Sequence, residues 1–387
     1  MKSDKFKIIL LTLVLILFLI FLEEKIIAYY GNLFYLIQLG SIFFIYYKYK
    51  NNLLFYLSPS FITLTYINLS FFLGQYVTSR GIGFDLKYYY AFKSFESLTF
   101  ITSFFLLANL AVFLSLNISK FRSINFPSYN KKINNNIPKI IFLLILILFF
   151  SFLKIDLGFL GGSGDFSYTF KLATSIYLVI LLKNEKPLIR YIIYSSLIFL
   201  FLVTSFDSKR EFFFPIILIA YFEIINNNVV LKINFRQLFI IISSLALSIY
   251  LILIASIMRG YGNFNVKNPI EASSYINEYI ESNYINDALT ANFELATTYG
   301  NTSNAVNYVY EGEVDYLFGS TFLKFLFIPI PRYILSEKPK SMVDIYTSKF
   351  SPSFRAKGGS LPIGIYAESY WNFGIFSILF IYLLFVG

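Results

Sequence analysis

Long apolar stretches recur along the whole of this 387-residue chain, and they constrain its fold more than any other feature. A helix needs about 20 apolar residues, with roughly 17 to 25 tolerated, to cross the hydrocarbon core of a bilayer. The sequence therefore predicts an all-α, polytopic membrane helix bundle of about ten spans. They are expected near residues 6–22, 28–47, 54–77, 98–117, 137–155, 169–182, 188–206, 211–226, 236–258 and 361–386.

The composition agrees with a membrane protein and removes several kinds of chemistry. Hydrophobic residues make up 57% of the chain and charged residues only 14%, whereas a soluble protein of this size needs a more polar surface. Because the chain has no Cys and no His, any acid–base chemistry must come from Asp, Glu, Lys or Tyr. The net charge of +10 is spread between apolar stretches, which favours cytoplasmic loops over nucleic-acid binding.

Lysine and arginine predict the orientation of the spans, because short cytoplasmic loops collect these residues. Starting from Lys2, Lys5 and Lys7, every second connecting segment is rich in basic residues and poor in acidic ones. This alternation predicts a multi-pass protein of the bacterial cytoplasmic (inner) membrane with its N-terminus in the cytoplasm. The first span is expected to stay in the membrane, since no small-residue cleavage site follows it.

Three parts are predicted along the chain. Residues 1–258 are expected to form a membrane helix bundle of about nine spans, and residues 361–387 the last span. Residues 259–360 between them form one large extracytoplasmic loop, acidic in its first half and basic in its second. Within the loop, the spacing of Ile and Glu predicts an amphipathic helix over Pro269 to Leu295. The apolar segment Phe318 to Leu335 holds a lysine and two prolines, which predicts a helix lying in the outer membrane interface.

Three arginines lie where predicted spans or the interfacial segment meet the outer surface: Arg210, Arg259 and Arg332. The planar guanidinium group pairs well with phosphate oxygens, and this pairing is stronger at a dry interface than in water. These arginines therefore predict a phosphate-binding site just above the outer leaflet, with snorkelling to lipid headgroups as the alternative interpretation. Basic residues that extend the predicted site are Lys209, Lys338 and Arg355.

Several short motifs around the large loop occur in an order that is typical of one family. Together they resemble the bacterial O-antigen and oligosaccharide repeat-unit polymerases (Wzy type), closely from Ser205 to Phe385 and by hydropathy alone before that. The family usually has about ten to fourteen spans, which implies further spans beyond Gly387. The motifs are Ser205-Phe-Asp-Ser-Lys-Arg210, Met258-Arg259-Gly260, Ile328-Pro-Ile-Pro-Arg332, Glu337-Lys338-Pro339, Gly358-Gly359-Ser-Leu-Pro362 and Ala367-Glu368-Ser-Tyr-Trp-Asn-Phe-Gly374.

The resemblance implies a membrane glycosyltransferase. Such an enzyme transfers a growing glycan from undecaprenyl pyrophosphate onto the non-reducing end of a lipid-linked repeat unit, outside the membrane. The product would be lipopolysaccharide O-antigen, capsule or another exopolysaccharide. The implied partners are undecaprenyl-pyrophosphate-linked oligosaccharides, the lipid bilayer, and flippase and chain-length regulator proteins, with no nucleic acid and no cofactor.

The chemistry of that transfer assigns roles to particular residues. Departing pyrophosphate needs preorganised positive charge, which Arg210, Arg259 and Arg332 can supply. If the acceptor hydroxyl needs a base, the absence of His leaves a carboxylate. Glu368, at the outer start of the last span, and Asp207 are the candidates, with an ion pair to an arginine as an equally good interpretation of Glu368. No metal is expected; Glu311, Glu313 and Asp315 could hold a cation, but a solvated acidic loop is the favoured interpretation.

Other functions compete with this hypothesis. A related O-antigen ligase would use the same pyrophosphate chemistry, but such ligases characteristically carry a His in the outer loop, and this chain has none. A transporter or flippase of lipid-linked sugars would carry charges near mid-membrane, whereas the charges here gather at the predicted outer edge. An assembly protein without chemistry is the third alternative. Metal-dependent membrane glycosyltransferases carry an acidic pair in the first outer loop, but Glu23-Glu24 is expected to cap the second helix instead.

Overall fold

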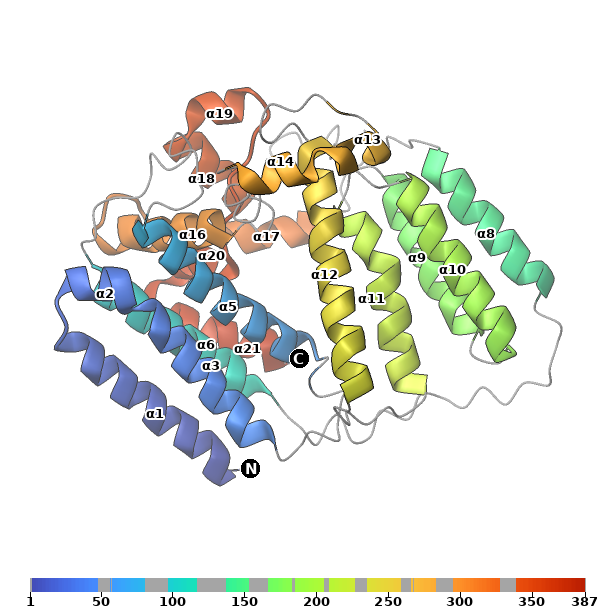
Figure 1. Ribbon diagram of the computed structural model, residues 1–387. Helices are drawn as coiled ribbons and strands as arrows, with labels where there is room; N and C mark the ends of the chain where they lie inside the picture. The colour runs from blue at the N-terminus through green and yellow to red at the C-terminus, as the bar shows by residue number, and fades with distance from the viewer. Residues whose placement is uncertain are drawn as a thin grey trace. The chain divides into compact units, whose positions relative to one another are not determined.

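The computed structural model describes two compact units of the chain (Figure 1). Unit 1 consists of residues 1–120, 275–327 and 338–387, and unit 2 of residues 121–274 and 328–337. Every described element is a helix, which confirms the all-α prediction for this part of the chain. The described residues are 2–47, 56, 58–80, 97–116, 137–152, 166–182, 185–204, 209–226, 235–258, 266, 268–282, 295–327 and 339–386, a few of them by their backbone alone.

Long apolar helices lie side by side in unit 1 (Figure 1). α6 is central, since it packs against α1, α5 and α21. Its interior faces are filled by aromatic rings: Phe71 of α5 lies 4.4 Å from Phe105 of α6 between ring centroids, and Tyr299 and Tyr366 join them. The long helices are α1 (Lys2–Ile20), α3 (Asn32–Tyr46), α5 (Pro59–Arg80), α6 (Leu98–Ser115) and α21 (Ser377–Val386).

Shorter helices complete unit 1. α2 (Glu24–Tyr30) precedes α3 at an angle of 55°. Gly31 joins them, and a Cβ there would lie 2.8 Å from Gln75 Nε2 of α5, so glycine permits the close packing. The helix α16 packs against α5 and α20. The remaining elements are α14 (Ile276–Glu281), α16 (Leu295–Tyr310), α17 (Ser320–Phe327), α18 (Met342–Phe350), α19 (Pro352–Ala356), α20 (Ile365–Phe373) and the 3-10 turn η5 (Gly374–Phe376).

Unit 2 contains helices that alternate in direction, so that the starts of α9 and α11 lie at the same end as the ends of α8, α10 and α12 (Figure 1). Its core is apolar and includes Ile147, Leu178, Leu197 and Phe201. The elements are α8 (Ile137–Phe152), α9 (Phe166–Leu181), α10 (Pro187–Thr204), α11 (Lys209–Asn226), α12 (Phe235–Met258) and α13 (Pro269–Ser274).

Fewer helices than predicted meet the requirements for crossing a bilayer. Within the described residues, Leu98–Ser115 and Ile365–Val386 are long and apolar enough, and the bent pair of α2 and α3 makes a third if it is one span. Five further apolar stretches within the described residues are shorter than a span: Ile137–Phe152, Phe170–Leu181, Pro187–Phe201, Phe214–Glu223 and Ile249–Met258. α8 has 16 residues and is therefore about 24 Å long, against a hydrocarbon core of about 30 Å. By length and composition the structure supports two or three spans, not about ten.

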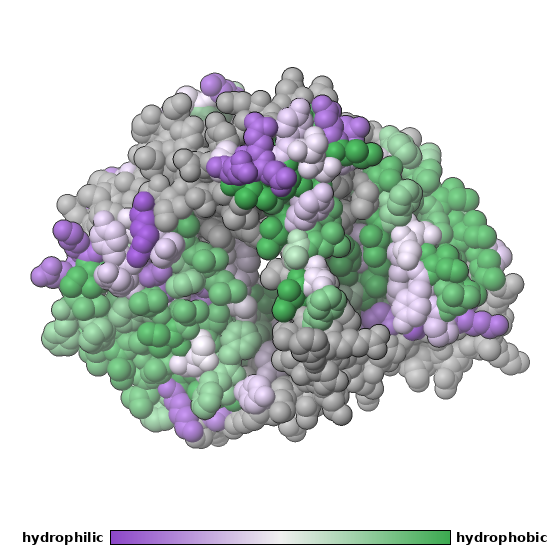
Figure 2. All heavy atoms as spheres, in the orientation of Figure 1, coloured by the Kyte–Doolittle hydropathy of each residue, from purple (hydrophilic) through white to green (hydrophobic). Residues whose placement is uncertain are grey.

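The outward faces of the long helices are nevertheless apolar. Phe6 and Phe18 of α1 and Phe142 and Phe152 of α8 are exposed. Figure 2 shows green, apolar colour over the flanks of α1 and α3 and again over α8 and α10. An apolar exterior of this extent is typical of surface that meets lipid instead of water.

Two local predictions are wrong. Glu23 does not cap α2 with its side chain, and the Glu24 carboxylate instead accepts hydrogen bonds from the backbone N–H and the hydroxyl of Thr99, in the first turn of α6. The expected single helix over Pro269 to Leu295 is also interrupted, because α13 ends at Ser274 and α14 begins at Ile276. Both differences come from tertiary contacts or backbone turns that a helical period does not reveal.

Candidate functional site

The predicted base Glu368 lies in the first turn of α20. The chain that leads into this helix is tied to α16. The Gly364 N–H donates to Thr302 Oγ1 at 3.0 Å, and Asn301 Nδ2 donates to the Pro362 carbonyl at 3.0 Å. Both α16 side chains are buried. The start of α20, and Glu368 with it, is therefore fixed to the interior of unit 1.

Two side chains of α17 interact with Glu368. The Thr321 hydroxyl hydrogen-bonds the Glu368 carboxylate, and the Lys324 ammonium attracts it electrostatically. Thr321 Oγ1 also accepts a hydrogen bond from Asn372 Nδ2 at 2.8 Å. Asn372 Nδ2 is in turn 2.7 Å from the Glu368 backbone carbonyl. The partly buried carboxylate thus belongs to a small polar cluster of Glu368, Thr321, Lys324 and Asn372, which we call the Glu368 cluster.

A tight turn brings α17 to this position. The Leu317 N–H donates to the Trp371 carbonyl at 3.0 Å, and Trp371 Nε1 donates to the Asp315 carbonyl at 3.0 Å. The Gly319 N–H donates to Asn372 Oδ1 at 2.8 Å. Gly319 has a φ of +85°, a backbone conformation that residues other than glycine rarely adopt. The turn is therefore fastened to α20 by three hydrogen bonds, and α17 starts immediately after it.

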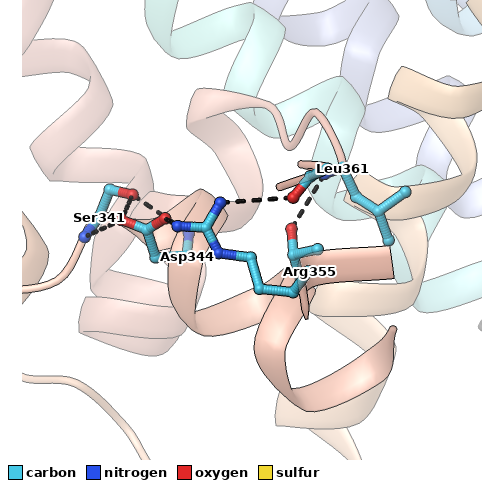
Figure 3. Close-up of polar contacts among 6 residues, drawn as sticks. Ser341, Asp344, Arg355 and Leu361 are labelled. Atoms are coloured by element: carbon cyan, nitrogen blue, oxygen red, sulfur yellow. Dashed lines mark hydrogen bonds and ion pairs between the residues drawn. The ribbon is translucent and has the colours of Figure 1, made fainter. Parts of the chain in front are cut away.

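Arg355, a predicted pyrophosphate ligand, is paired with a carboxylate in unit 1 (Figure 3). Its guanidinium group forms an ion pair with Asp344 and donates to the Gly359 carbonyl at 3.3 Å. Asp344 also closes a capping box with Ser341 at the start of α18. Burial alone would raise the pKa of Asp344, but the Ser341 hydrogen bonds and the Arg355 charge outweigh it and hold that pKa below its usual value. Arg355 therefore helps to hold α18 and α19 together.

A buried polar network in unit 1 was not predicted from the sequence. Tyr366 Oη donates to Asn109 Oδ1 at 2.7 Å, and Asn109 Nδ2 donates to Gln38 Oε1 at 3.2 Å and to Asn68 Oδ1 at 2.9 Å. Gln38 Nε2 continues to Thr12 Oγ1 at 3.1 Å. The network joins α1, α3, α5, α6 and α20, and it ends two residues before Glu368. Its sequence signal was the presence of Asn and Gln inside apolar stretches.

Basic residues gather at one end of unit 2. Lys209 and Arg210 open α11, at the same end as the start of α9 and the end of α10 (Figure 1). At that end Lys171 of α9 is buried, donates to Thr204 Oγ1 at 3.0 Å, and lies 4.1 Å from the centre of the Phe201 ring. Lys171 is thus a further basic residue near the predicted arginine site, and sequence reasoning missed it.

The opposite end of unit 2 holds a partly buried ion pair. Arg190 of α10 and Glu223 of α11 approach to 3.1 Å, and Tyr194 Oη donates to Glu223 Oε1 at 2.9 Å. Arg190 lies in the first turn of α10 and Glu223 in the last turn of α11. This pair therefore links two helix ends and does not lie at mid-helix.

The other predicted site residues lie outside the described part of the chain or are described only in part. The backbone of Arg210 and Lys209 is described, but not their side chains. Glu368 and Arg355 belong to unit 1, whereas Arg210 belongs to unit 2, so the predicted meeting of Arg259 and Glu368 over Arg210 stays a prediction. Asp207, Arg259, Arg332 and Lys338 lie outside the described residues.

No protein-family model, curated protein or solved structure matches this chain. The resemblance to repeat-unit polymerases therefore depends on the order of the motifs alone.

Proposed function

We propose that this protein polymerises undecaprenyl-pyrophosphate-linked oligosaccharide repeat units on the outer face of the bacterial cytoplasmic membrane. The order of the motifs around the large loop supports this function, and so do the apolar helices with apolar outward faces. In the proposed topology the N-terminus is cytoplasmic and the shorter apolar helices also cross the membrane. The bilayer accommodates these short helices by local thinning, and their longer neighbours fit the thinner region by tilting.

The Glu368 cluster is the observation that carries the proposal. A carboxylate at the start of an apolar, membrane-competent helix is costly unless it has partners, and such residues are commonly functional. Here Glu368 is held by Thr321 and lies beside Lys324. Preorganised partners of this kind keep a base in one orientation, which is what general base catalysis requires.

The proposed reaction balances without a cofactor. The acceptor hydroxyl oxygen attacks the anomeric carbon of the donor sugar, and the bond between that carbon and the pyrophosphate oxygen breaks. The acceptor proton passes to the Glu368 carboxylate, with Asp207 as the second candidate. Undecaprenyl pyrophosphate leaves with the electron pair.

Positive charge at the leaving group is assigned to Arg210, Arg259 and Arg332, with Lys209 and Lys338 beside them. Cations fixed in place before the reaction stabilise the charge that develops on the leaving oxygen. Arg355 is left out of this set, because it is paired with Asp344.

Complementation of a polymerase-deficient strain tests the proposed function. The wild-type chain is expected to restore a ladder of polymer lengths, whereas Arg210→Ala and Arg259→Ala are expected to leave single repeat units at normal protein abundance. Normal ladders from both variants would remove the phosphate site from the proposal. A strain that lacks the protein and accumulates repeat units on the cytoplasmic side would instead indicate a flippase.

A further inference from the structure

Unit 1 has an exposed apolar surface that is formed by its shorter elements and not by its long helices. It is formed by Phe318, by Leu323 and Leu326 of α17, and by Ile375 and Phe376 of η5, and we call it the α17–η5 surface. The side chains of Phe318, Leu326 and Phe376 are 82, 70 and 76% exposed. Large exposed apolar groups that lie together mark a surface that another apolar body covers.

The parts of this surface are packed into one body. The Phe318 ring lies 6.2 Å from the Tyr316 ring, and the Tyr316 ring covers Gly374, where an added Cβ would be 3.1 Å away. Gly374 is the first residue of η5. On its inner side α17 packs through Phe322, whose ring lies 4.6 Å from that of Phe380 in α21. The α17–η5 surface is therefore continuous with α21.

The two stripes of α17 face different surroundings. Thr321 and Lys324, three residues apart, interact with Glu368. Leu323 and Leu326, also three residues apart, are exposed. A short helix with a polar stripe and an exposed apolar stripe is typical of a segment at a membrane surface.

The neighbouring helix indicates what covers the apolar stripe. α21 is part of the membrane-competent helix Ile365–Val386, and its exposed side chains include Leu379 and Leu383. The apolar outward side of a spanning helix is covered by acyl chains. Because α17 packs onto α21 through the Phe322 and Phe380 rings, the same acyl chains can cover both.

We propose that the α17–η5 surface is embedded in the bilayer and contacts acyl chains, so that the Glu368 cluster, which the other stripe of α17 contacts, lies at the boundary of the lipid. A consequence follows for the substrate, and this consequence rests on the proposed function. A lipid-linked sugar reaches Glu368 directly from the bilayer, with its prenyl tail along Leu323 and Leu326 and its charged head group near Lys324.

The absence of cysteine from the chain makes this proposal directly testable. Single variants Leu326→Cys and Phe376→Cys are spin-labelled in the full-length protein and reconstituted into phosphatidylethanolamine–phosphatidylglycerol vesicles. Ser353→Cys and Lys357→Cys, both exposed and in or next to α19, serve as controls. The labels at 326 and 376 are expected to collide more often with dissolved oxygen, which concentrates in lipid, than with a water-soluble nickel chelate. The two controls are expected to show the reverse.

Two results would overturn the proposal. Nickel access at 326 and 376 equal to that of the controls would show a water-exposed surface. Protection from both reagents would show that protein, such as a second copy of the chain, covers it. Leu323→Cys and Leu379→Cys provide the same measurement if the first pair does not fold. Because the readout does not use activity, lipid contact in a protein that makes no polymer would overturn the proposed function alone.

Discussion

Replacement of Asn109 by leucine is expected to destabilise unit 1 by roughly 2–5 kcal/mol. The Asn109 side chain makes three hydrogen bonds, to Gln38, Asn68 and Tyr366, and all four side chains are buried. Side-chain hydrogen bonds between membrane helices average about 0.6 kcal/mol each and reach about 1.7 kcal/mol. Leucine has a similar volume, so the loss comes mainly from the three bonds and not from a cavity.

The chain contains a convenient probe for this measurement. Its one tryptophan is Trp371 in α20, the helix that Tyr366 ties to Asn109. Unfolding in mixed micelles, with increasing sodium dodecyl sulfate, is followed by tryptophan fluorescence and by helical circular dichroism. Asn277→Leu on the exposed face of α14 is the matched control, and it is expected to change the free energy of unfolding by less than about 0.5 kcal/mol.

A double-mutant cycle tests whether the stability lost in Asn109→Leu comes from its hydrogen bond to Tyr366 or from the change in polarity alone. Tyr366→Phe is expected to cost about 1 kcal/mol in the wild-type chain. In the Asn109→Leu background its cost should approach zero, because its acceptor is already absent. Equal costs in the two backgrounds, or an Asn109→Leu variant as stable as the Asn277→Leu control, would refute the network.

Three further predictions concern the site and its framework. Glu368→Gln is expected to abolish polymer ladders in cells at normal protein abundance, whereas Glu278→Gln on the exposed face of α14 should keep them; a normal ladder from Glu368→Gln would exclude the base. The pKa of Asp344 is lowered in the folded state, so its stabilisation is present above the ordinary value near 4 and is lost as the pH falls through the lowered pKa. Asp344→Asn should remove this contribution to the loss of thermal stability at acid pH, an effect under about 1 kcal/mol for so exposed a pair. A pH dependence of the melting temperature equal to that of the wild type would contradict the ion pair. Gly374→Ala is expected to lower the free energy of unfolding by at least about 1 kcal/mol, because Gly374 has a φ of +55° and the Tyr316 ring lies against it. Gly40→Ala, with nothing within 4 Å of the new Cβ, should not destabilise the protein in the same melts.

The sequence predicts where helices occur better than where they end or bend. Apolar runs correctly indicated α1, α6 and α21, because such a run consists of residues that are adjacent in the sequence. The bend at Gly31 and the break at Gly374 depend instead on Gln75 and Tyr316, which are distant in the chain and fill the space beside each glycine. Local pattern cannot reveal such contacts.

The candidate site shows the same division. The position of Glu368 in the first turn of a helix could be predicted, since it directly precedes the last apolar run. Its partners Thr321 and Lys324 lie more than 40 residues away and come from a turn that folds back onto α20, so sequence spacing gave no indication of them. The charge of Arg355 suggested a phosphate ligand, which stays a prediction, while its ion pair with Asp344 in the preceding helix had no sequence signal.

Reconstitution of the purified protein tests the central claim most directly. The protein is placed in vesicles with chemically defined undecaprenyl-pyrophosphate-linked repeat units, and both glycan length and released undecaprenyl pyrophosphate are measured. The proposed reaction predicts polymers of increasing length, with one undecaprenyl pyrophosphate released for each new linkage and no release by Glu368→Gln. Translocation of intact repeat units across the vesicle membrane, without new linkages or released carrier, would contradict the account.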